Sequence, residues 1–232
     1  QSVKSVMKQL YSYKLDSIES IVMDNVFFGC GIQYITPQSL NEELPLFDEC
    51  SKLGITSDAI IDNRTELFEM LYVSMEKRDD ITDSQLILMA YRKWGENCPE
   101  YLIGDYAFAI WDEERKQLFC ARDHVGKRTF YYHHSKQMFA FCTVMKPLLH
   151  IKGISSELNN YWIADYLSMD TLVHEIDCTK TIYKDIQQLP PAHTLVLKNG
   201  EMVVKCYWNP LNAPELGLKT NEEYEEAFRD IF

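Results

Sequence analysis

The sequence has little that would place it in a membrane or mark it for export. No apolar run approaches the roughly 20 residues that a helix needs to span a bilayer. A basic segment followed by an apolar core, as in a secretion signal, is also missing. Internal repeats and low-complexity tracts do not occur. We therefore expect a cytoplasmic globular protein with no membrane partner.

Positive charge is scarce. The chain has 35 acidic and 23 basic residues, for a formal charge of −12. A protein this acidic is repelled by phosphate backbones, which argues against nucleic-acid binding. Its 232 residues are 46% hydrophobic and 25% charged, which is typical of globular proteins and excludes a disordered or collagen-like chain. This length suits one large domain or two small ones.

Closely spaced cysteine pairs are also absent. The seven cysteines are Cys30, Cys50, Cys98, Cys120, Cys142, Cys178 and Cys206. Disulfide frameworks and structural zinc sites usually have closer pairs, so we expect buried, reduced thiols and no bound metal. His133 and His134 lie near an expected turn with no Cys, Asp or Glu beside them, and we predict a surface position for both.

The hydrophobic pattern that is present predicts many strands. Strand-like segments occur at residues 25–35, 52–61, 106–111, 117–122, 129–134, 138–143, 193–197 and 202–208. Residues 106–111 form a nearly unbroken apolar run, which is typical of a strand buried on both faces. Asn199-Gly200 is a strong hairpin signal between the last two segments.

Helices are expected between groups of strands. One includes Val3, Met7 and Leu10, and a short one begins at Asn63. Another starts at a capping box in residues 82–85 and ends at Gly95, followed by helices at 160–169 and after an N-cap at Asn221. Largely antiparallel strands with interspersed helices predict an α+β fold of two stacked sheets with helices outside. Because the sequence begins and ends within expected helices, we expect a fragment of a longer protein, or a chain whose ends lie beyond these residues.

Several motifs occur in a specific order. They are Asp83-Ser-Gln-Leu-Ile-Leu through Trp94-Gly95, residues 104–112, Ala121-Arg-Asp-x-x-Gly126, Tyr131-Tyr132 and Leu189-Pro-Pro-Ala-His193. Over residues 24–208 the chain resembles the glutamine amidotransferase domain of the asparagine synthetase family. This resemblance implies the four-layer αββα sandwich of N-terminal-nucleophile hydrolases.

The resemblance also implies a domain organisation. Residues 1–210 would form the amidotransferase-like domain, and residues 211–232 a linker and helix leading to a synthetase domain. The nucleotide-binding motif Ser-Gly-Gly-x-Asp-Ser of that second domain does not occur here. ATP and Mg²⁺ are therefore expected only in the synthetase domain, and this chain is expected to need no cofactor.

Glutamine hydrolysis in such a domain needs a first-residue cysteine, whose own amine acts as base, and an arginine for the substrate carboxylate. Gln1 cannot replace that cysteine. Ile32 stands where the resemblance places the arginine, and no Arg or Lys occurs between Lys14 and Lys52. We therefore expect no catalytic residue in this chain.

The segment that should stabilise the oxyanion is altered as well. Active relatives have Asn-Gly-Glu, whereas this chain has Asp58, Ala59 and Ile60. Losing one oxyanion donor costs about 2.7–4 kcal/mol, and losing an ionic hydrogen bond to the carboxylate costs about 1.5–3 kcal/mol. Of the former glutamine pocket, only Asp83, the acid for the substrate ammonium, is retained. Asp83 is equally well explained as a helix-start acid that needs no ligand.

Other conspicuous residues have structural explanations. Asp105, Asp112, Arg122 and Asp123 are expected to form a buried polar network. Cys30 lies near the former pocket, and we interpret it as a small buried residue rather than a reactive thiol.

Three functions remain open. The leading hypothesis is a glutaminase-like domain that cannot hydrolyse glutamine, within an ATP-dependent amide-forming protein. One alternative is an active glutamine-hydrolysing asparagine synthetase whose N-terminal Cys strand lies outside this chain. The other is a peptide- or partner-binding module, because residues 58–67 are similar to a variant found in lasso-peptide cyclases. The expected partners are the chain's own synthetase domain, a second copy in a homodimer, or a peptide substrate.

Overall fold

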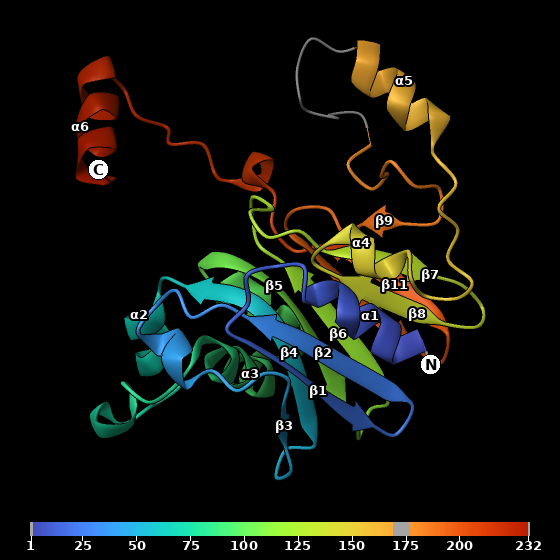
Figure 1. The fold of residues 1–232 in the computed structure, drawn as a ribbon. Helices are drawn as coiled ribbons and strands as arrows, with labels where there is room; N and C mark the ends of the chain where they lie inside the picture. Colours follow the sequence, from blue (N-terminus) through green and yellow to red (C-terminus); the bar gives the residue numbers. More distant parts are fainter. Residues whose placement is uncertain (1, 169–176, 232) are drawn as a thin grey trace.

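The computed structural model describes residues 2–168 and 177–231, and its centre is a six-stranded antiparallel sheet (Figure 1). The sheet order is β11-β10-β6-β5-β4-β3. Its strands are β3 (Leu46–Asp48), β4 (Leu53–Ile61), β5 (Gly104–Asp112), β6 (Gln117–Arg122), β10 (His193–Lys198) and β11 (Glu201–Cys206). All except β3 are predicted from the sequence, and the Asn199-Gly200 turn joins β10 to β11 as expected.

The two faces of β5 serve two different hydrophobic cores. Tyr106, Phe108 and Ile110 point toward one core, and Ala107 and Ala109 point toward the other. This alternation follows from the two-residue period of a strand. It explains why the segment reads as a continuous apolar run.

A second β layer covers one face of this sheet. It consists of the hairpin β1 (Ser17–Met23) with β2 (Val26–Ile32), and of a three-stranded sheet in the order β8-β7-β9. The latter strands are β7 (Tyr131–His134), β8 (Phe139–Cys142) and β9 (Gln187–Gln188). Phe28 and Phe130 pack with Ala107 and Ala109 in the core between the two layers. Two stacked antiparallel layers are thus present, with the second one split in two.

Helices form the outer layers. On one side, α2 (Arg64–Met70) and α3 (Asp83–Trp94) bury Leu67 and Leu86 against the six-stranded sheet. On the other side, α1 (Ser2–Leu10) and α4 (Met145–Leu148) contact each other, and α4 contacts β7 and β8. A Cβ added at Gly29 would lie 2.4 Å from Met7 Sδ, so α1 packs directly on β2. The order of layers is α, β, β, α, which confirms the expected four-layer sandwich.

The predicted capping box is present at the start of α3. Thr82 Oγ1 accepts from the Gln85 backbone N–H at 3.3 Å, and Gln85 Oε1 accepts from the Thr82 N–H at 3.0 Å. Asn63 precedes α2 but its side chain does not cap that helix. Instead it donates to Tyr101 O and accepts from the Ile103 N–H, because these groups would otherwise lack partners at the start of β5.

Two further helices extend from the sandwich. They are α5 (Asn160–Ser168), whose predicted last residue 169 lies outside the described residues, and α6 (Asn221–Ile231). The predicted N-cap of α6 is Asn221, but the side chain that caps the helix is that of Thr220, whose Oγ1 accepts from the Glu223 N–H. Figure 1 shows α6 at the end of an extended segment, away from the sandwich, and none of its residues is buried.

Candidate functional site

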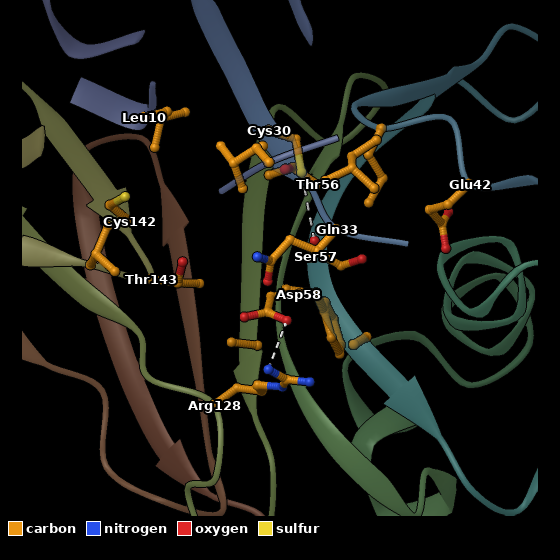
Figure 2. A pocket seen from close by; sticks show the side chains of 18 of the residues that line it. Leu10, Cys30, Gln33, Glu42, Thr56, Ser57, Asp58, Arg128, Cys142 and Thr143 are labelled. Atoms are coloured by element: carbon orange, nitrogen blue, oxygen red, sulfur yellow. Dashed lines mark hydrogen bonds and ion pairs between the residues drawn. The ribbon is translucent and has the colours of Figure 1, made fainter. Parts of the chain in front are cut away.

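A cavity of about 340 Å³ lies between the two β layers, at the ends of β2, β4 and β8. Figure 2 shows the side chains around it. Its polar and ionisable lining residues are Lys14, Cys30, Gln33, Thr36, Ser39, Glu42, Thr56, Ser57, Asp58, Arg128, Cys142 and Thr143. Two of its lining residues are exposed: Tyr13, in the turn after α1, and Ile35, in the loop after β2. This volume is sufficient for a ligand the size of an amino acid.

The cavity brings together four of the five residues predicted for the former glutamine pocket. Ile32, Asp58, Ala59 and Ile60 all line its wall. Ile32 is 7% exposed at the end of β2 and contributes no charge. Asp58 lies on β4 opposite Ala107 of β5, and Figure 2 shows its carboxylate at the centre of the view.

Asp58 forms an ion pair across the cavity with a residue that the sequence analysis did not single out. Its Oδ1 lies 3.4 Å from Arg128 Nη1. Burial raises the pKa of Asp58 above its ordinary value of 3.8, Arg128 opposes this shift, and Asp105 adds to it. The cavity wall therefore carries a carboxylate and a guanidinium where the resemblance places neutral donors.

Arg128 is presented by a rigid loop. The Asp123 carboxylate accepts from the backbone N–H groups of Val125, Lys127 and Arg128. The Arg122 guanidinium donates to the carbonyls of Arg128, Gly126 and Leu189. Arg122 and Asp123 thus form a buried structural network that fixes the start of the Arg128 side chain. The predicted network of four is only half right, because Asp112 binds Arg115 in its own turn and Asp105 is only partly buried.

Asp83, the fifth predicted residue, lies outside the lining of this cavity. It is 5% exposed at the first turn of α3 and forms an ion pair with Arg64. Arg64 also donates to Ile81 O. Burial raises the pKa of Asp83, and Arg64 opposes this shift. Its contacts are those of a buried helix-start acid with its own counter-ion.

Glu42 is the second acid on the cavity wall. Its carboxylate accepts from Thr82 Oγ1 at 2.9 Å and from the Ser84 N–H at 3.5 Å. Burial raises its pKa above 4.5, while the hydrogen bonds from Thr82 and Ser84 oppose the shift. Glu42 therefore connects the loop after β2 to the N-terminus of α3.

Two thiols line the cavity. Cys30 Sγ lies 3.8 Å from Ser57 O, and burial raises the pKa of Cys30 to about 12. Burial raises the pKa of Cys142 as well. Because the thiolate is the nucleophilic form, neither thiol is activated for attack on an amide.

Cysteines elsewhere correct one expectation. Cys98 and Cys120 are buried as predicted, but Cys50, Cys178 and Cys206 are exposed. All seven are free thiols. Among the described residues, no group of three His, Cys, Asp or Glu could hold a metal ion.

The histidine pair corrects another expectation. His134 is exposed as predicted, but His133 is 8% exposed and its Nδ1 lies 2.8 Å from Asp185 O.

Within residues 2–168 and 177–231, no helix combines the length and hydrophobicity that crossing a bilayer requires.

The residues missed by sequence reasoning are Arg128, Glu42 and Lys14. Arg128 had one available signal: a carboxylate at position 58 inside a cavity needs a cation nearby. Arg128 follows the Ala121-Arg-Asp-x-x-Gly126 motif by two residues, within reach of that wall. Glu42 and Lys14 lie in loops and carried no comparable signal.

Comparisons with known proteins agree with this architecture. A family model described as a glutamine amidotransferase domain matches residues 20–208. Asparagine synthetase [glutamine-hydrolyzing] 3 of Bacillus subtilis is 28% identical over 151 residues, which cover 63% of this chain and 24% of that protein. Amidase chry2 of Gibberella zeae is 27% identical over 153 residues, covering 64% and 22% of the two chains. The chain spans about a quarter of the length of these relatives.

A solved structure supports the fold. Glutamine phosphoribosylpyrophosphate amidotransferase from B. subtilis, complexed with ADP and GMP, superposes with a TM-score of 0.50 at 14% identity. The match covers 78% of this chain and 34% of that one. At this identity the likeness concerns the fold alone. The family model confirms the resemblance predicted for residues 24–208, and its match begins four residues earlier, at residue 20.

Proposed function

Because the chain belongs to the glutamine amidotransferase domain family and is related to asparagine synthetases, we propose that it is a glutaminase-deficient amidotransferase domain of an ATP-dependent amide-forming protein. The observation that carries the proposal is the Asp58 carboxylate on the cavity wall, ion-paired with Arg128. Amide hydrolysis passes through a tetrahedral oxyanion, which needs neutral or positive donors. A carboxylate in that position repels the oxyanion.

Two other features of the cavity support the same conclusion. Ile32 leaves the end of β2 without a cation for the substrate carboxylate. Cys30 and Cys142 have raised pKa values, so the described cavity offers no thiolate. Together, substrate binding and transition-state stabilisation are both weakened.

The amine used by such a protein would come from its second substrate rather than from glutamine. A peptide amine, as in the lasso-peptide cyclases that residues 58–67 resemble, is one such donor. ATP and Mg²⁺ would act in the synthetase domain. The role of this domain would then be to support that domain and its substrate channel.

A glutaminase assay on the full-length protein tests this proposal. Glutamate release from glutamine is measured with ATP and acceptor substrate present, beside an assay in which ammonium replaces glutamine. We expect no glutamate above the background of a reaction without the protein. Release of one glutamate per amide formed would refute the proposal and favour the alternative of an active asparagine synthetase.

A further inference from the structure

We infer that Arg128 is a carboxylate-binding side chain of the cavity. In the unaltered protein the carboxylate of Asp58 takes the place that a ligand carboxylate would have beside Arg128. The two side chains meet through one contact, Nη1 to Oδ1 at 3.4 Å. Charge-assisted hydrogen bonds between such groups are usually about 2.7–2.9 Å, and Arg–carboxylate pairs are frequently bidentate. The pair is therefore loose, and most of the donors of Arg128 are not used by Asp58.

The remaining donors of Arg128 support a binding role. Arg128 Nε is buried and has no hydrogen-bond partner. An unsatisfied buried donor costs free energy. The Nε of an arginine with a purely structural role therefore normally has a hydrogen-bond partner. Among the described residues, no second carboxylate lies within 4 Å of Arg128. The guanidinium is thus not part of a closed network, in contrast to Arg122, which donates three hydrogen bonds to carbonyls.

Arg128 is also accessible and fixed in position. Its side chain is 27% exposed, and that of Asp58 is 43% exposed. Its backbone N–H donates to Asp123 Oδ2 at 2.9 Å, and its carbonyl accepts from Arg122 Nε at 2.6 Å. A guanidinium on a fixed backbone loses less entropy when it binds a carboxylate.

The size and polarity of the cavity define the ligand class. About 340 Å³ accommodates a small carboxylate such as a free amino acid. Asp58 competes with that ligand at the high effective concentration of an intramolecular group. The unaltered protein should therefore bind small carboxylates weakly, and removal of the Asp58 charge should expose the site.

The inference rests on the proposed function to the extent that both concern this cavity, but the two fail separately. Glutamate release by the unaltered protein would refute the proposed function whatever the variants bind. The inference depends only on how binding responds to Asp58 and Arg128.

The test is calorimetric titration of the full-length protein with L-glutamate. The variants are Asp58→Asn and Asp58→Ala, each alone and as a double variant with Arg128→Gln. Asp105→Asn is the matched control, because it removes the same charge nearby without contacting Arg128. We expect at least about a tenfold gain in affinity in the Asp58 single variants. The gain should be lost in the double variants and absent in Asp105→Asn.

Two Asp58 variants keep the test decisive. Asp58→Ala introduces no amide donor, so a gain there comes from the released guanidinium. A gain in either single variant that the Arg128 substitution abolishes supports the inference. No gain in both variants, a gain that survives in the matching double variant, or an equal gain in Asp105→Asn overturns it.

Discussion

Arg64 and Asp83 form a buried ion pair outside the cavity, with side-chain exposures of 16% and 7%. Arg64 also reaches Ile81 O, so the pair joins α2 to the start of α3. The acid that the family resemblance assigns to the substrate ammonium therefore has a counter-ion within the fold. This relationship gives Asp83 a structural role that is testable by stability.

Arg64→Met should destabilise the protein strongly. It would leave the buried Asp83 carboxylate without its counter-ion, a change that typically costs about 3–5 kcal/mol. The free energy of unfolding in urea measures the loss. Arg92→Met is the control, because Arg92 is 58% exposed and lies 3.9 Å from Asp48. It should cost less than about 1 kcal/mol. Similar losses in the two variants would contradict a structural role for the Arg64–Asp83 pair.

Glu42 predicts a pH dependence of stability. Its pKa is raised in the folded state from the ordinary value of 4.5, mainly by burial. The folded state therefore holds this proton more tightly, and the contribution to stability is complete below pH 4.5 and lost as the pH rises through the folded pKa.

Relative to the unaltered protein, Glu42→Gln should therefore gain stability as the pH rises above 4.5. Urea midpoints measured from pH 4 to pH 8 test this. Glu43→Gln is the control, since the neighbouring Glu43 is exposed. A stability of Glu42→Gln that falls relative to the unaltered protein as the pH rises would show that the sign is wrong.

Replacement of Gly104 by a residue with a side chain is predicted to lower the stability of the protein. Gly104 has a φ of +148°, and a Cβ there would lie 2.1 Å from Ile60 O on the neighbouring strand. Gly104→Ala should cost about 1–3 kcal/mol, because the backbone of β4 would have to move. At Gly217 an added Cβ meets nothing within 4 Å, so Gly217→Ala should stay within about 0.5 kcal/mol. Thermal unfolding of the two variants distinguishes a local clash from a general effect of adding a methyl group.

Thiol labelling should divide the cysteines by exposure. Cys50, Cys178 and Cys206 are exposed and should react first with a maleimide at pH 7.5. Cys30, Cys98 and Cys120 are buried, and burial raises their pKa values, so they should react only after unfolding. Mass spectrometry of peptides over a time course gives the order. Fast labelling of Cys30 in the folded protein would contradict the assignment of an inactive thiol.

Strands with strong local patterns were predictable. β5 and β6 are apolar over most of their length because both faces are buried, and their predicted ranges match closely. β1 was not predicted, because Glu19 and Ser20 interrupt its apolar residues and are exposed in the structure. β3 and β9 have three and two residues, too few for a periodic signal.

The candidate site was predictable only in part. Residues 58–60 and Ile32 could be placed on the cavity wall, because the family motifs fix their positions on β4 and β2. Arg128 is 70 residues from Asp58 in the sequence, and only the tertiary fold, which places the loop after β6 beside β4, brings the two charges together. The burial of His133 has the same origin, since its partner Asp185 belongs to a distant segment.

The two-sided burial of β5 restricts how this domain can change over evolution. A one-residue insertion or deletion within Gly104–Asp112 would turn every following side chain to the opposite face, so that large residues such as Phe108 and Ile110 would collide with the neighbouring layer. Length variation should therefore be confined to the turns, such as residues 113–116 between β5 and β6. Point replacements on the cavity wall leave this alternation intact, which is how a domain can exchange one chemistry for another while its scaffold persists.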